Sequence, residues 1–183
     1  MQIHPTLKIA ALFAAFLLLS APGVFGGGEG VVGCVQLIGA AAEAARQERM
    51  NQQVLARAEQ GDAEAQRYIG HKDLFVTVNE FKAEEAHKWL CRSAAQGHAP
   101  AQYDLGLFYS GDLDRQHYTT FIDFPHDDAY AYKWLTLASR SGFVLAQSRL
   151  EELNKSISPV DKRRGEQLLK NWRSRPCGPP VIR

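Results

Sequence analysis

The sequence predicts an all-α protein, an array of helix-turn-helix pairs stacked into a solenoid. The segments 58–66 and 94–102 match at six of nine positions with an offset of 36 residues. An offset of 45 superposes AHKWL at 86–90 on AYKWL at 131–135. The same offset aligns 142–147 with 97–102. Apolar residues recur at helical spacing in each segment. A period in the thirties that carries two helical patterns is typical of stacked helix pairs.

The composition is that of a globular protein. The 183 residues are 45% hydrophobic and 22% charged, which excludes a disordered or collagen-like chain. A mean hydropathy of −0.27 excludes a multi-span membrane protein. Because 21 Lys and Arg face 20 Asp and Glu, the net charge of +1 argues against polyanion binding by the whole chain. The three cysteines are too few for a disulfide scaffold, and whether any of them pair is left open.

Residues 1–26 are predicted to be a cleaved signal peptide. Lys8 precedes the apolar run 9–19, whose eleven residues would span only about 16 Å as a helix, roughly half a bilayer core. Small residues follow the run, so we expect a periplasmic or secreted protein; an uncleaved anchor is the alternative. Residues 27–39 are predicted to be a Gly-rich linker. They include Val31–Cys34, which resembles a lipobox, but fourteen residues separate Cys34 from the apolar run and make a lipid anchor less favoured.

The repeat array is expected over residues 40–175. An opening helix at 40–60 precedes two units at about 62–97 and 98–142; closing helices follow at 143–173, before a tail at 176–183. Small residues let neighbouring helices approach closely, tryptophans supply bulk, and glycines in the left-handed conformation end the second helix of each unit. These structural positions are Ala65, Gly70, Trp89, Gly97, Ala101, Gly106, Trp134, Gly142 and Ala146.

The second unit departs from the first. Its two helical motifs are separated by a nine-residue insertion that falls within 111–124. Pro125 and the acidic pair at 127–128 predict the start of the next helix, with proline in the first turn and acids facing the helix dipole.

The pattern A-x-A-Q-x-x-Φ-G, then A-x-K-W-L, then A-x-Q-G resembles SEL-1-like repeats, relatives of tetratricopeptide repeats. Ser158–Trp172 is similar to the closing helix of secreted bacterial members. The likeness covers about residues 50–173 and implies a right-handed α/α superhelix with a C-terminal capping helix. It also implies a bacterial protein that binds another protein. Some members with a cysteine pair in each repeat are associated with penicillin binding, and this sequence lacks that pattern.

Two clusters could carry chemistry, and each has a simpler explanation. His87 and Cys91 are spaced i, i+4 on one helix, but the repeat places Cys91 at an inward position, so we expect a buried, inert thiol. His126, Asp127 and Asp128 could bind a cation, but acids at a helix N-terminus are the favoured explanation of this cluster. We therefore predict no catalytic residue, no metal ligand and no cofactor.

Recognition is expected on first-helix positions that lie between the packing positions. The insertion, with its aromatic side chains, would add a second exposed surface. The predicted binding residues are Arg67, Tyr103, Asp104, Tyr118, Phe121 and Arg149. The expected function is non-enzymatic scaffolding in the bacterial cell envelope, with a monomer that binds another protein.

Two alternatives remain open. One is a cell-wall-related envelope enzyme, either a hydrolase or a penicillin-interacting protein. The other is a surface protein docked by its basic end, because residues 155–183 carry eight Lys or Arg against two acids. An anionic surface is then the partner. No basic, aromatic-rich surface indicates nucleic acid.

Overall fold

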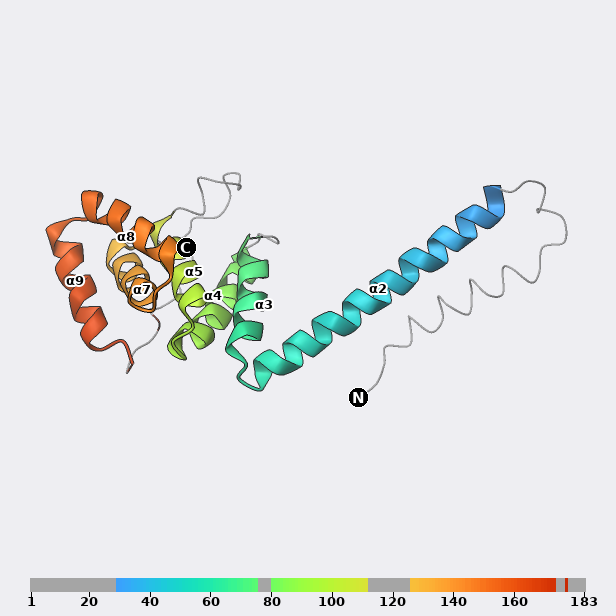
Figure 1. Cartoon of the computed structure of the whole chain (residues 1–183), viewed down its shortest axis with the longest axis horizontal. Helices are drawn as coiled ribbons and strands as arrows, with labels where there is room; N and C mark the ends of the chain where they lie inside the picture. Colours follow the sequence, from blue (N-terminus) through green and yellow to red (C-terminus); the bar gives the residue numbers. More distant parts are fainter. Residues whose placement is uncertain (1–28, 76–79, 112–125, 174–176, 178–183) are drawn as a thin grey trace. The chain divides into compact units, whose positions relative to one another are not determined.

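The computed structural model describes residues 29–75, 80–111, 126–173 and 177 (Figure 1). All regular secondary structure within these ranges is α-helical, as the sequence predicts. The predicted signal peptide and most of the insertion lie outside the described residues. The chain divides into two compact units, Met1–Arg49 and Met50–Arg183.

The first described helix, α2, spans Glu29–Glu59 and crosses the boundary between the units. It begins well before residue 40, so the prediction of a linker at 27–39 is wrong for residues 29–39. The segment contains no proline, and the alanine run 40–42 directly after Gly39 has the highest intrinsic helix propensity. Leu37 and Ile38 are exposed on α2.

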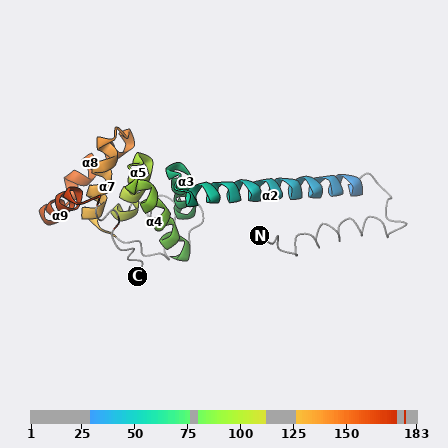
Figure 2. The same ribbon diagram turned by 90° about the horizontal axis from the view of Figure 1, so that it is seen from below.

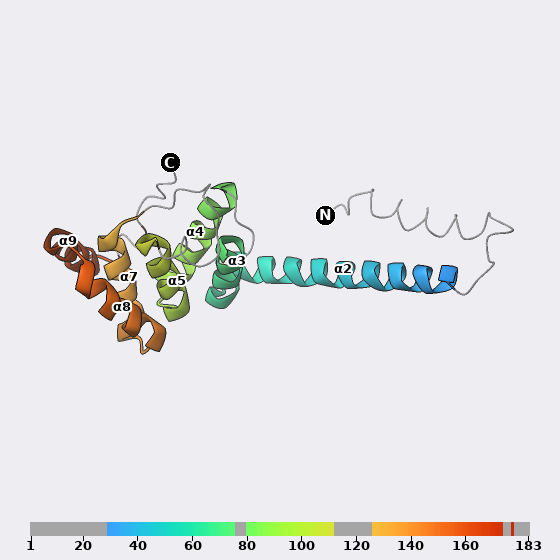
Figure 3. The same ribbon diagram turned by 90° about the horizontal axis from the view of Figure 1, so that it is seen from above.

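In the described part of the second compact unit, Met50–Arg183, six helices follow α2. They are α3 (Ala63–Phe75), α4 (Glu80–Ala95), α5 (Ala99–Ser110), α7 (Asp128–Arg140), α8 (Val144–Ser156) and α9 (Pro159–Lys170). The α3/α4 and α5/α7 pairs pack most extensively, α4 contacts α5, and both α8 and α9 pack on α7. Within this unit α3 lies at one end and α9 at the other (Figure 2, Figure 3).

The core of this unit lies between the α3/α4 and α5/α7 pairs and extends to α8. Trp134 on α7 is completely buried and is the largest side chain in this core. Trp89 occupies the equivalent position on α4 but is only half-buried, with the Arg92 guanidinium 4.7 Å above its ring. The expectation that both tryptophans supply core bulk therefore holds for Trp134 alone.

Three glycines bring helices into close contact. A Cβ added to Gly70 would lie 2.7 Å from Leu90 Cγ, and one added to Gly106 would lie 2.6 Å from Leu135 Cδ2. Leu90 and Leu135 share a repeat position, as do the two glycines. The same contact therefore occurs in both repeat units, 62–97 and 98–142. Gly165 on α9 makes a third contact, 2.7 Å from a Tyr132 ring atom, and the repeat pattern does not identify it.

The helix ends follow local rules. Gly61, Gly97 and Gly142 have φ of +98°, +88° and +83°, the left-handed conformation expected of residues that end a helix. Asp127 is the N-cap of α7, where its side chain accepts from the Ala129 and Tyr130 amides. The helix thus begins at Asp128, and Pro125, expected in its first turn, lies outside the described residues.

Candidate functional site

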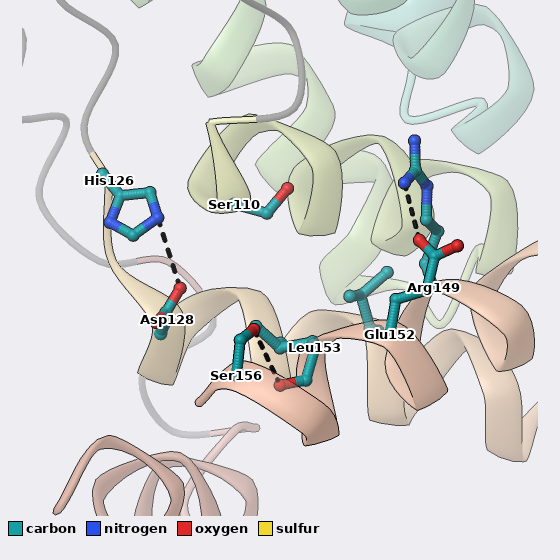
Figure 4. A pocket seen from close by; sticks show the side chains of 8 residues that line it. Ser110, His126, Asp128, Arg149, Glu152, Leu153 and Ser156 are labelled. Atoms are coloured by element: carbon teal, nitrogen blue, oxygen red, sulfur yellow. Dashed lines mark hydrogen bonds and ion pairs between the residues drawn. The ribbon is translucent and has the colours of Figure 1, made fainter. Parts of the chain in front are cut away.

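A groove of about 620 Å³ lies between α5, α7 and α8 and is the candidate binding site (Figure 4). We call it the α5–α8 groove. It is lined by Ser110, His126, Asp128, Leu135, Arg149, Glu152, Leu153 and Ser156. Most of these side chains are polar or charged, so the groove suits a hydrophilic ligand or peptide segment.

Four titratable side chains of the groove form two pairs, which lie at opposite ends of the view (Figure 4). His126 Nε2 lies 3.4 Å from Asp128 Oδ1 at the start of α7. On α8, Arg149 Nη1 donates to Glu152 Oε2 over 2.8 Å, at the i, i+3 spacing that places both residues on one helix face. Both pairs retain solvent-accessible atoms, so a ligand can compete for the same groups.

The first turn of α7 fixes the acidic end of the groove. Asp127 caps the helix and also accepts from Arg164 Nη2 on α9 over 2.6 Å. The Asp127 amide donates to the Tyr109 carbonyl over 2.8 Å, which ties the start of α7 to the end of α5. The Asp127 carboxylate is therefore already used in structural contacts. It is less able to serve as a ligand for the cation considered at residues 126–128. Among the residues that the structure describes, no group of three or more His, Cys, Asp or Glu side chains could hold a metal ion.

Two predicted binding residues pair with each other. Arg67 Nε on α3 donates to Asp104 Oδ2 on α5 over 2.8 Å, and His71 Nδ1 lies 3.2 Å from the same oxygen. The Asp104 side chain is only 2% exposed, in contrast to the surface position that the repeat pattern predicts. The pair joins α3 to α5, and a buried carboxylate needs such a partner because desolvation is costly.

The other predicted binding residues are dispersed. Tyr103 is half-buried and its ring centroid lies 5.1 Å from that of Phe143. Of the predicted binding residues that the structure describes, Arg149 alone lines the α5–α8 groove. Tyr118 and Phe121 lie outside the described residues.

Cys91 is buried, as the repeat spacing predicts, but its sulfur is bonded to that of Cys177, so the expectation of a thiol at this position is wrong. The sulfurs form a disulfide that joins α4 to the C-terminal segment across 86 residues of sequence. Repeat spacing places Cys91 inward but gives no information about a partner so distant in sequence. An oxidised sulfur is no nucleophile, so this residue cannot act as a catalytic thiolate in this state.

His87 lies beside this disulfide in the core. Its Nε2 is 2.7 Å from the Tyr109 hydroxyl and 3.6 Å from Cys91 Sγ. Burial lowers the pKa of His87 to about 4, so the imidazole is neutral at physiological pH. A neutral histidine enclosed by Phe108 and Tyr109 packs as a core side chain.

The sequence pattern does not identify Lys133 as a buried cation. Lys133 on α7 is completely buried, with Nζ 4.0 Å from the Trp134 ring centroid and 5.6 Å from that of Tyr130. Burial lowers the pKa of Lys133 to about 8. The repeat equivalent, Lys88, is exposed and pairs with Glu84 and Glu85, so the pattern predicts an exposed lysine here as well.

The basic C-terminal residues are partly committed to intramolecular contacts. Arg164 bridges Asp127 and Asp161, and Lys162 Nζ donates to Asn154 Oδ1 over 2.9 Å. The Arg173 guanidinium lies 5.5 Å from the Trp172 ring centroid. Of these contacts, only the ion pairs of Arg164 offset positive charge that could otherwise meet an anionic surface.

Comparison with known proteins finds no match to a family model and none to a curated protein. Within the described part of the chain, none of the helices combines the length and the apolar character needed to cross a bilayer.

Proposed function

We propose that the chain is a protein-binding scaffold of the bacterial cell envelope, built as a right-handed superhelix of SEL-1-like units. The observation that carries this proposal is the α5–α8 groove, a large polar recess bordered by α5, which begins the second unit, and by α8, the first of the closing helices. In helical repeat proteins, extended binding surfaces arise where successive units stack.

Recurrent side-chain contacts support the repeat assignment. Gln66 Nε2 donates to the Ala58 carbonyl over 2.9 Å, and Gln102 Nε2 donates to the Ala94 carbonyl over 3.2 Å. Both glutamines reach back eight residues to the end of the preceding helix. Together with the equivalent contacts at Gly70 and Gly106, these bonds fit one packing solution used twice.

The Cys91–Cys177 disulfide supports an extracytoplasmic location. Disulfides persist in the periplasm and outside the cell, whereas cytoplasmic thiols are kept reduced. This agrees with the signal peptide expected at residues 1–26. We propose a monomeric, non-enzymatic binding protein in that compartment.

The test is photo-crosslinking from a residue that lines the groove. A photo-crosslinking amino acid replaces Ser156, which lines the groove, and in a matched control it replaces Arg163, which is exposed on α9. We expect a discrete covalent product with an envelope protein from position 156 and none from position 163 when the chain is expressed in its native host, with the product identified by mass spectrometry.

A second variant carries the exchange Arg149→Glu with Glu152→Arg in the background of the crosslinker at position 156. The exchange retains the net charge and allows an ion pair at the same spacing but reverses the polarity of the groove. We expect the product to disappear while the thermal midpoint of unfolding is unchanged. Equal products from positions 156 and 163, or a product that survives the exchange, would contradict the groove as the binding surface.

A further inference from the structure

A second cavity, of about 610 Å³, lies at the other end of the α5/α7 pair. Ser110 and His126 of the α5–α8 groove lie where α5 ends and α7 begins, whereas this cavity lies where α5 begins and α7 ends. We call it the α4–α7 cavity. It is lined by Ala95, Gln96, Gly97, Gln102, Leu137, Arg140, Ser141, Trp172 and Arg173.

The cavity coincides with a break in the repeat. In the first unit, Gln66 Oε1 accepts a hydrogen bond from Gln96 Nε2 over 2.9 Å. The equivalent acceptor in the second unit is Gln102 Oε1, and the residue equivalent to Gln96 is Ser141. Serine is too short to reach, and its hydroxyl donates to the Leu137 carbonyl instead.

Gln102 is consequently left with an unused acceptor. Its side chain is 1% exposed, and Oε1 has no hydrogen-bond partner in the described structure. Buried polar atoms are nearly always paired, and Gln102 lines the cavity, so a donor that enters the cavity, a water or a ligand, would satisfy this acceptor.

The rim of the cavity is cationic. Arg140 ends α7 and is exposed, and Arg173 lies against Trp172. Among the described residues that line the cavity, none is acidic. Leu137 and Trp172 add apolar surface, so the lining combines two guanidinium groups, an apolar wall and one buried acceptor.

We propose that the α4–α7 cavity binds the free C-terminal residue of a peptide. The last amide N–H donates to Gln102 Oε1, the α-carboxylate pairs with Arg140 and Arg173, and the terminal side chain packs on Trp172. Guanidinium groups bind carboxylates through paired, charge-assisted hydrogen bonds. The volume is within the usual range for small-ligand sites. The site is formed by other residues than the α5–α8 groove and stands independently of it.

The test is an NMR titration of the full mature chain with N-acetyl-Ala-Ala, which has a free carboxylate. We expect saturable shifts at the Gln102 side-chain amide. Amidating the probe's carboxylate, or methylating its last amide nitrogen, should each weaken binding at least about tenfold. Probes ending in L-alanine and D-alanine distinguish a protein C-terminus from a bacterial wall peptide as the source of the ligand.

The decisive variant is Ser141→Gln, which restores the residue found at the equivalent position of the first unit. We expect its amide to donate to Gln102 Oε1 and fill the cavity, abolishing probe binding without lowering the thermal midpoint of unfolding. Arg140→Gln should weaken binding at least about tenfold, whereas Arg163→Gln, on the exposed surface of α9, should leave it unchanged.

Several results would overturn the proposal. They are the absence of saturable binding to the wild-type chain, equal binding of the amidated probe, undiminished binding to a folded Ser141→Gln variant, and equal losses in the Arg140→Gln and Arg163→Gln variants.

Discussion

His87 is a titratable side chain that the fold keeps neutral. Its pKa in the folded chain is about 4 against 6.5 for the free side chain, because burial disfavours the imidazolium. The unfolded chain therefore takes up this proton first, and stability falls as the pH falls from 6.5 towards 4. Above pH 6.5 the effect is absent.

This residue gives the first prediction. Between pH 7 and pH 5, His87 should lower the free energy of unfolding by about 2 kcal/mol. Urea unfolding at both pH values checks it, with His87→Gln as the control that retains hydrogen-bonding capacity but does not titrate. The difference between the two pH dependences isolates the histidine from the carboxylates; if the two chains lose equal stability, His87 is not neutral in the folded protein.

Arg67 carries the second prediction. Arg67→Ala leaves the buried Asp104 carboxylate with only the His71 contact and should destabilise the chain by about 2–3 kcal/mol. Adding Asp104→Asn removes the unpaired charge and should recover part of the loss. Denaturant unfolding of both variants measures the effect. A loss below about 0.5 kcal/mol for Arg67→Ala would mean that the pair acts as an ordinary surface ion pair.

At the scale of the helices, the glycine contacts control how closely pairs can pack. A Cβ on Gly70 meets both Leu90 Cγ at 2.7 Å and the Ala86 carbonyl oxygen at 2.8 Å. A Cβ on Gly106 meets only the Leu135 side chain at comparable distance, and a side chain can move more easily than a backbone carbonyl.

The third prediction ranks these glycines. Gly70→Ala should destabilise by about 2–3 kcal/mol, and Gly106→Ala by about 1 kcal/mol, because only the latter clash can be relieved by rotation of a side chain. Gly39→Ala on α2 is the control: nothing lies within 4 Å of its added Cβ, so the gain in helix propensity should leave stability equal or slightly higher. Thermal unfolding compares the three, and equal losses at Gly70 and Gly106 would refute the ranking.

The helices show what sequence can predict. A glycine after an amphipathic segment marks a helix end through its own backbone preference, so Gly97 and Gly142 are identifiable locally. Gly165 is not, because its small size matters only once α9 lies on Tyr132 of α7. Arg67 and Asp104 are 37 residues apart, and a pattern that marks both as variable between packing positions does not indicate that they meet.

The same limit applies to the candidate sites. The repeat pattern identifies Arg149, which lines the α5–α8 groove, but the groove itself also depends on how α7 begins. The Cys91–Cys177 pairing depends on where the segment after α9 returns to α4, which no local signal specifies.

For the whole molecule, the disulfide gives the fourth prediction. Closing a loop of 86 residues should stabilise the fold by about 4 kcal/mol in the chain-entropy account. Reductant, or the double change Cys91→Ser with Cys177→Ser, should therefore lower Tm by about 10 °C. Calorimetry with and without reductant measures this. The double variant must be insensitive to reductant, and a wild-type Tm that reductant leaves unchanged would contradict a stabilising bond.

The bond also determines how the chain carries mechanical load. A force applied between the two termini passes from Cys91 straight to Cys177, so α5, α7, α8 and α9 are shielded from tension. The sequence separation of 86 between the two cysteines amounts to about 300 Å of hidden contour length. A chain pulled between its termini would therefore extend through its N-terminal helices first, while both cavities beside α5 and α7 stay intact.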